Sequence, residues 1–179
     1  MNSKYFFLSL LFLLIISCKD QQTIKTIAKV DADSLIVNIE KYGNTKVEVE
    51  GKIIHICGVD QKKMKLKTNN GGIIKIVAKD SSAFDKSYNK TDIKVIGLVE
   101  ESSIDKAYID KIEKDKTILC HIDNTPCKAS DWIDEQIKSG KADEMVKQKV
   151  EKLRNQIHQS NNSKIITVTI LADSIAIID

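Results

Sequence analysis

The sequence lacks the short motifs that mark the common enzyme chemistries. It has no glycine-rich phosphate-binding loop, no Gly-x-Ser-x-Gly nucleophile turn and no His-Glu-x-x-His pair. Acidic residues are abundant, but no two of them have a spacing that by itself identifies a catalytic pair. We therefore expect the chain not to be an enzyme, and a binding or adaptor module is the leading interpretation.

Aromatic residues are scarce and the charges nearly cancel. The 179 residues include one Trp, four Tyr and four Phe, and the formal net charge is +3. Proteins that hold single-stranded nucleic acid usually combine a basic groove with aromatic rings on which the bases stack. A nearly neutral chain gives no general reason to expect nucleic acid or an anionic membrane surface as a partner. Nucleic-acid binding is therefore kept as the alternative to the binding or adaptor role.

The longest apolar run lies near the start of the chain. Residues 1–4 carry one lysine, and an apolar stretch over 5–16 and then Ser17 and Cys18 follow them. A cationic start, an apolar core of about a dozen residues and a small residue form the layout of a secretory signal. The stretch is too short for a membrane-spanning helix, which needs about 20 residues.

The segment Ile15-Ile16-Ser17-Cys18 resembles the bacterial lipobox. The resemblance implies cleavage after Ser17, a diacylglycerol on the thiol of Cys18 and an acyl chain on its amine, which together anchor a protein stably. We expect a signal peptide over 1–17, whose loss removes one lysine and lowers the formal charge from +3 to +2, and a tether over 18–30. The expected location is the cell envelope, with the protein lipid-anchored at the outer membrane and facing the periplasm.

From residue 46 the hydrophobic pattern has a period of two, which predicts β-strands. A helix comes first, capped by Asp31 or Asp33 and ended by Gly43 in a left-handed conformation. Strands are expected over 46–57, 63–67, 73–79 and 93–99, with an Asn-Asn-Gly-Gly hairpin turn after the second and a short helical stretch over 81–88.

Glycines recur at matching positions of the first and fourth expected strands, at Gly51 and Gly97. A glycine inside a strand permits the bulge or sharp coil that a small closed barrel needs to turn its corners. Three strands, a helix and a fourth strand, in this order, predict a five-stranded OB-fold Greek-key barrel. The expected fold class is mainly β with α, with the barrel domain over 31–116.

The fifth strand of the barrel has two candidates. Residues 104–114 follow the fourth strand directly, although Ile104, Tyr108 and Ile112 have helical spacing. Residues 165–171 are rich in β-branched side chains and form a confident strand. The sequence leaves both candidates open.

Residues 117–179 are expected to form a loop, a helical segment and the C-terminal strand, all packing on the barrel. The helical segment runs from residue 131 to about 159 and is broken at Ser139-Gly140. Its second half has an apolar stripe of Val146, Val150, Leu153 and Ile157. Such a stripe suits docking onto the barrel, and coiled-coil pairing is the other use.

The stretch from residue 31 to 113 resembles a family of exported OB-fold lipoproteins of Gram-negative bacteria. The matching segments are Val47-Glu48-Val49-Glu50-Gly51, His55-Ile56-Cys57, Lys62-Lys63-Met64, Phe84-Asp85-Lys86, Val95-Ile96-Gly97 and Ile104-Asp105-Lys106-Ala107-Tyr108. The family is described as nucleic-acid-binding OB-folds of the anticodon-binding type, without a settled activity. Its members often have a His-x-Cys-x-His cluster, of which this chain keeps His55 and Cys57 but has Val59 in place of the second histidine.

His55 and Cys57 lie two residues apart on an expected strand, so both side chains leave the same face. Without a bulge at Gly51 they share the face of Val47 and Ile53 and are buried. With a bulge, Ile54 and Ile56 point into the core and the His–Cys pair turns outward. A packed or merely surface-lying pair is favoured over a ligand pair.

A second group of candidate ligands is Cys120, His121 and Cys127, which surround a turn-forming Asn-Thr-Pro sequence. In an oxidising compartment Cys120 and Cys127 could close a disulfide loop, which leaves Cys57 as the odd thiol. Alternatively, these three residues join His55 and Cys57 in one zinc or copper site if the loop folds over the end of the first strand. A metal- or redox-linked envelope protein is therefore the second alternative function. Free thiols are the remaining interpretation.

Four lysines form a candidate ligand face across the second and third expected strands. They are Lys63, Lys65, Lys67 and Lys75. OB-folds often bind on this surface, but no aromatic residue falls in these two strands. A solvated lysine face, which also discourages pairing between sheet edges, is therefore the favoured interpretation.

Overall fold

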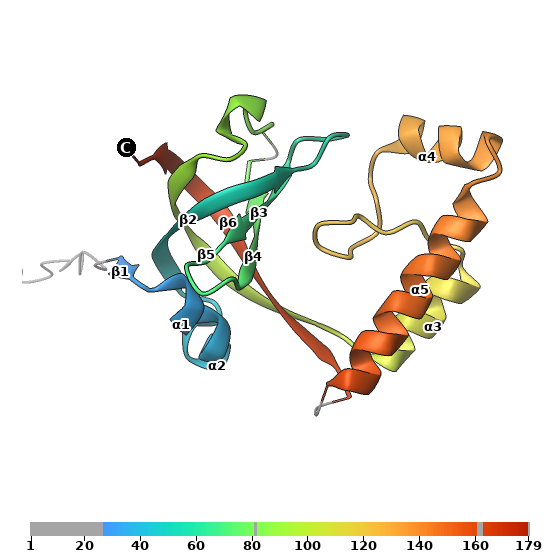
Figure 1. Cartoon of the computed structure of the whole chain (residues 1–179), viewed down its shortest axis with the longest axis horizontal. Coiled ribbons are helices and arrows are strands. Elements are labelled where there is room, and N and C mark those ends of the chain that lie inside the picture. The colour runs from blue at the N-terminus through green and yellow to red at the C-terminus, as the bar shows by residue number, and fades with distance from the viewer. Residues whose placement is uncertain (1–26, 81, 161–162, 179) are drawn as a thin grey trace, which may run out of the picture.

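The computed structural model describes residues 27–80, 82–160 and 163–178 (Figure 1). The expected signal peptide, the expected lipidation site Cys18 and the first part of the expected tether lie outside these residues. Within the described residues, no helix combines the length and the hydrophobicity needed to cross a membrane.

Five strands form a closed barrel of the OB-fold type, which confirms the expected fold class. The strands are β2 (Lys46–Ile56), β3 (Lys63–Lys67), β4 (Ile73–Ala78), β5 (Asp92–Ile104) and β6 (Ile165–Ile177). They are joined in the order β2-β3-β4-β6-β5, and β5 pairs back onto β2. Only the β4–β6 pair of the barrel is parallel. The short strand β1 (Ala28–Lys29) pairs with β2, and a 3₁₀ turn, η1 (Lys86–Tyr88), precedes β5.

The C-terminal run is the fifth strand of the barrel. It pairs in parallel with β4 over residues 169–172 and antiparallel with β5 from Ile165 to Ile177. The segment expected to form the barrel, 31–116, therefore holds four of its five strands. Residues 105–164 form an insertion between β5 and β6, and the other candidate strand is the helix α3 (Lys106–Lys114), capped by the side chain of Asp105.

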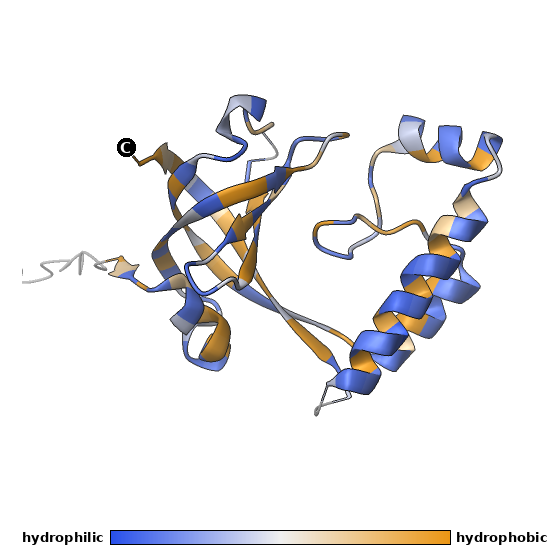
Figure 2. Cartoon of the chain, viewed as in Figure 1, coloured by the Kyte–Doolittle hydropathy of each residue, from blue (hydrophilic) through white to orange (hydrophobic). Residues whose placement is uncertain are grey.

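The barrel interior contains the apolar residues of the period-two pattern. Polar residues alternate with them along the strands (Figure 2). The largest fully buried side chains of this core are Leu35, Ile53, Met64, Leu66, Ile74, Ile76, Ile93 and Ile170. Leu35 belongs to α1 (Ala32–Val37), which with α2 (Ile39–Tyr42) lies against one end of the barrel (Figure 1).

The first helix begins as expected but ends differently. Asp31 caps α1 by accepting a 2.8 Å hydrogen bond from the Ser34 amide. The expected left-handed glycine at the end of this helical stretch is wrong, because Gly43 has a φ of −52°. The left-handed residue is Asn44, with a φ of 58°, and asparagine is one of the few non-glycine residues that tolerate this region.

The insertion has an apolar core of its own. Besides α3 it contains α4 (Ser130–Lys138) and α5 (Ala142–Gln159). Val146, Val150 and Leu153 of α5 pack with Ile109 and Ile112 of α3, away from the barrel core. The expected docking of this stripe onto the barrel is therefore wrong, because α3 supplies the apolar face that covers it. The loop between α3 and α4 reaches back from the helices toward the barrel (Figure 1).

Gly51 and Gly97 sit where strands approach too closely for a side chain. A Cβ added at Gly97 would overlap the Leu171 carbonyl oxygen and lie 2.6 Å from Cγ2 of Ile170. A Cβ added at Gly51 would lie 2.8 Å from the Lys67 carbonyl oxygen. Both obstacles belong to neighbouring strands of the barrel, so the two glycines permit the closure that their matching positions predicted.

We expect Gly97→Ala to lower the free energy of unfolding by about 2–3 kcal/mol, because the backbone of β6 must shift to admit the methyl group. Gly58→Ala is the matched control, since a Cβ there meets no atom within 4 Å, and it should change stability by less than about 0.5 kcal/mol. Urea unfolding of both variants measures the difference. Equal stability of the two would contradict the proposed close approach.

Candidate functional site

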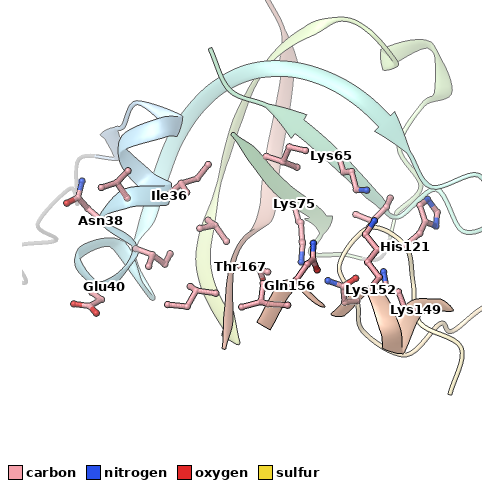
Figure 3. Close-up of a pocket in the computed structure, with 18 of the residues that line it drawn as sticks. Ile36, Asn38, Glu40, Lys65, Lys75, His121, Lys149, Lys152, Gln156 and Thr167 are labelled. Atoms are coloured by element: carbon pink, nitrogen blue, oxygen red, sulfur yellow. The ribbon is translucent and has the colours of Figure 1, made fainter. Parts of the chain in front are cut away.

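A cavity of about 780 Å³ lies between the barrel and the insertion (Figure 3). Its walls come from α1 and α2, from β3, β4 and the start of β6, and from α5 and the loop before α4. β3 and β4 are the second and third strands of the barrel, whose face is the usual binding surface of OB-folds. The volume falls within the range of about 300–1,000 Å³ found for small-ligand pockets.

Four lysines from three elements converge on this cavity (Figure 3). Lys65 and Lys75 are directly opposite each other on β3 and β4, and Lys149 and Lys152 come from α5. Among the described residues, none of the four forms an ion pair with a carboxylate. Like charges that face each other across two strands destabilise a sheet, so this arrangement costs stability unless an anion joins it.

Lys75 carries the largest part of this cost. Its side chain is buried, with 8% of the residue exposed, and its ammonium donates a 3.3 Å hydrogen bond to the carbonyl oxygen of Asp123. The pKa of Lys75 is lowered from 10.5 to about 8, mainly by burial and also by the charges of Lys149 and Lys65, while Asp123 opposes the change. The pKa of Lys149 is also lowered, first by burial and then by Lys152 and Lys65.

Lys63 has a different role from its neighbours. Its ammonium lies 2.6 Å from the carboxylate of Asp123, and the two side chains are only 11% and 8% exposed. It also donates a hydrogen bond of 2.9 Å to Oγ1 of Thr125. This ion pair holds the loop of the insertion on β3 and keeps the pKa of Asp123 below its usual range, against the opposing effect of burial.

The four predicted lysines thus divide into three groups. Lys65 and Lys75 line the cavity, Lys63 is used in the ion pair, and Lys67 is exposed and outside the lining. Sequence reasoning missed Lys149 and Lys152. With Gln156 they recur at helical spacing beside the apolar stripe of α5. This spacing predicts that they share one face of the helix, but it does not predict which element that face lies against.

A bulge in β2 decides which way His55 points. Ile53 pairs with Leu66 and His55 with Lys65, so Ile54 is the extra residue of the ladder. Ile53 and Ile56 are buried in the barrel core, whereas Ile54 is 39% exposed. Neither alternative therefore holds in full. His55 is turned out of the core, but the bulge lies at Ile54 and not at Gly51, Ile54 is exposed where the outward alternative buried it, and Cys57 is buried.

His55 and His121 meet where the insertion touches the barrel. Their Nε2 atoms are 2.7 Å apart and their rings are arranged edge to face. Such a contact requires one ring to donate a proton and the other to accept it. Burial lowers the pKa of His121, and the charges of His55, Lys65 and Lys149 lower it further. The ring that accepts the proton in this contact is a neutral imidazole.

All five predicted His and Cys ligands line a second pocket, of about 210 Å³. Cys57 and Cys120 are buried together with Ile122, and Cys127 is half-buried. Burial raises the pKa of the Cys120 thiol. The loop does fold over the end of the first barrel strand, as a joint site requires. Among the described residues, however, no three His, Cys, Asp or Glu side chains are placed to share one metal ion, and the zinc or copper site stays a prediction.

The three described cysteines are free thiols, so the predicted Cys120–Cys127 disulfide is not formed here. The amide of Cys120 donates to the carbonyl of Thr125, and the amide of Cys127 to the carbonyl of Ile118. The two cysteines are therefore diagonal neighbours in the small hairpin and not directly opposite. Diagonal Cα atoms are about 7–8 Å apart, beyond the separation that a disulfide usually spans.

We expect Lys63→Met to lower the free energy of unfolding by about 3 kcal/mol, because it leaves the buried Asp123 carboxylate without its partner. Asp123→Asn should also destabilise, and the double variant should lose less than the sum of the two. A double-mutant cycle by urea unfolding measures the coupling. Glu50→Gln is the control, since the Lys29–Glu50 pair is 65% and 43% exposed and contributes little. Additive effects of Lys63→Met and Asp123→Asn would contradict the ion pair.

Neither the protein-family models nor the curated protein sequences with which the chain was compared gave a match.

Proposed function

We propose that the protein is a lipid-anchored OB-fold binding module, and that the cleft between the barrel and the insertion binds a small anionic ligand. The observation that carries the proposal is the set of four lysines, Lys65, Lys75, Lys149 and Lys152, which line one cavity without a carboxylate partner among the described residues. A phosphate or carboxylate group placed between them would accept several charge-assisted hydrogen bonds.

The composition of the cleft favours a compact anion over a single strand of nucleic acid. Among the described residues that line it, the imidazole of His121 is the only ring, and no Phe, Tyr or Trp is present. Stacking on aromatic rings supplies about 1–3 kcal/mol per base in proteins that bind single strands. Nucleic-acid binding through the same lysines remains the alternative function, and the binding experiment below includes it.

Removing a lysine of the cleft should weaken ligand binding without lowering the stability of the protein. We expect isothermal titration with pyrophosphate to show binding that Lys75→Met or Lys149→Met weakens at least about tenfold, since hydrogen bonds to charged groups contribute about 1.5–3 kcal/mol. Lys147→Met is the matched control, because it removes the same charge from α5 outside the cleft. Lys75→Met should not lower the stability of the free protein, because it removes the cost of burying a charge.

The same titration has a pH signature. An anion binds the charged form of Lys75, whose pKa in the free protein is about 8. The affinity for the anion should therefore fall between pH 7 and pH 9, and Lys75→Met should reduce this fall.

The pKa of Lys75 is lower in the folded than in the unfolded protein. Its stability penalty is therefore fully present below pH 8 and is relieved as the pH rises from 8 toward 10.5. Tighter, steeply salt-dependent binding of an oligonucleotide would favour the alternative instead.

The anchor is proposed from the lipobox-like segment that ends at Cys18. We expect metabolic labelling with a radioactive fatty acid to mark the protein, and Cys18→Ser to abolish both the label and its recovery in the membrane fraction, since acyl chains contribute about 0.8 kcal/mol per buried methylene. Cys57→Ser is the control, because it removes a thiol outside the lipobox. An intact Met1 without a lipid adduct on mass spectrometry of native material would refute the anchor while leaving the cleft proposal standing.

A further inference from the structure

The cleft has an apolar half as well as a cationic half. The lysines lie at one end, with His121 and Gln156, and the residues contributed by α1 and α2 lie at the other (Figure 3). The lining at that second end and along the floor is rich in aliphatic side chains. These are Ile36, Val37, Ile39, Ile73, Ile165 and Ile166.

Three of these aliphatic residues are exposed although they are large. Val37 is 80% exposed, Ile73 48% and Ile166 39%. They come from α1, β4 and β6, yet all three border the same cavity. Scattered exposed aliphatic residues are normal on a protein surface, but a gathering of them beside polar groups marks a binding surface. The cleft therefore offers apolar contact along part of its length.

Charge is distributed along the cleft in a way that sets the orientation of a ligand. Among the described residues that line it, the one carboxylate is Glu40, which lies at the apolar end, opposite the lysines (Figure 3). Lys41, beside Glu40, is the one cation at that end among the residues that the structure describes. The anionic group of a ligand is therefore attracted to the lysine end and not to the other end. The apolar part of the same ligand would contact Val37 and Ile166.

We propose that the ligand is a single-chain anionic amphiphile, with its phosphate or carboxylate head group between Lys75 and Lys149 and its acyl chain along Val37, Ile73 and Ile166. This inference rests on the proposed function, since it names the class of anion that the cleft binds. The complementarity is of both charge and hydrophobicity, and the cavity of about 780 Å³ is of the size that holds a ligand of this kind.

A homologous series of alkyl phosphates tests the inference. Binding of inorganic phosphate, hexyl, octyl and decyl phosphate, each below its micelle concentration, is measured by isothermal titration on the full chain carrying Cys18→Ser, which bears no acyl group of its own. Each added methylene should strengthen binding roughly twofold to fourfold. Equal affinity along the series would overturn the amphiphile inference and leave anion binding intact, whereas no binding of any member would refute both.

Matched variants show where the alkyl chain of the ligand lies. Val37→Ser combined with Ile166→Thr should reduce the gain per methylene while leaving the affinity for inorganic phosphate unchanged. Ile137→Ser, which removes a 59% exposed aliphatic side chain from α4 outside the cleft, should change neither. If the affinity of the double variant still rose with alkyl length as in the unmodified protein, the inference would be overturned, because the alkyl chain would then lie elsewhere. Light scattering that shows a dimer which the double variant dissociates would overturn it too, because a second copy would then cover the apolar end.

Discussion

The carboxylate of Asp123 extends from the insertion to β3 and meets the ammonium of Lys63 at 2.6 Å, with both side chains almost fully buried. The same carboxylate accepts hydrogen bonds from the amide and the hydroxyl of Thr125, which shape the turn that carries it. Its residue also offers a carbonyl oxygen to Lys75. The barrel core and the core of the insertion are separate clusters, so this loop contact fixes where the helices stand over β3 and β4.

Charge pairing explains why lysines on one strand have different roles. Lys63 and Lys65 point to the same side of β3, and both lie under the insertion. Asp123 neutralises Lys63 and leaves Lys65, Lys75 and Lys149 to repel one another, which is why burial and like charge together lower the pKa of Lys75 and of Lys149. Lysines on a solvated face would have little of the energetic cost that comes from burying like charges close together. The favoured interpretation from the sequence therefore does not describe Lys75, which is buried and hydrogen-bonded to Asp123, a residue 48 positions away in the chain.

The barrel could be predicted from the sequence because its signals are local. Alternation marks each strand, and Gly51 and Gly97 mark the places where β2 and β5 turn. The fifth strand and the partner of the α5 stripe could not, because both depend on whether residues 104–114 are strand or helix, and their apolar spacing serves either. The bulge at Ile54 has no glycine to announce it. The cleft could not be predicted either, because Lys65 and Lys149 come together only when the insertion folds back onto the barrel. The same helix also has several other lysines, and the sequence does not distinguish them.

The separation of the two cores has a consequence for how a ligand acts on the molecule. Lys75 belongs to the barrel and Lys149 to the insertion, and their repulsion across the cleft is strongest when no anion lies between them. An anion bound by both residues replaces that repulsion with attraction to a common charge. A ligand that binds the folded protein and not the unfolded chain stabilises the folded protein by its binding free energy. The ion pair at Asp123 and the His55–His121 contact hold the loop, and Ile104 of β5 and Ile165 of β6 pack with the apolar cluster of α3 and α5. In the proposed function the ligand is therefore part of the interface, and the stability that the unpaired lysines cost the free protein is recovered when the ligand binds.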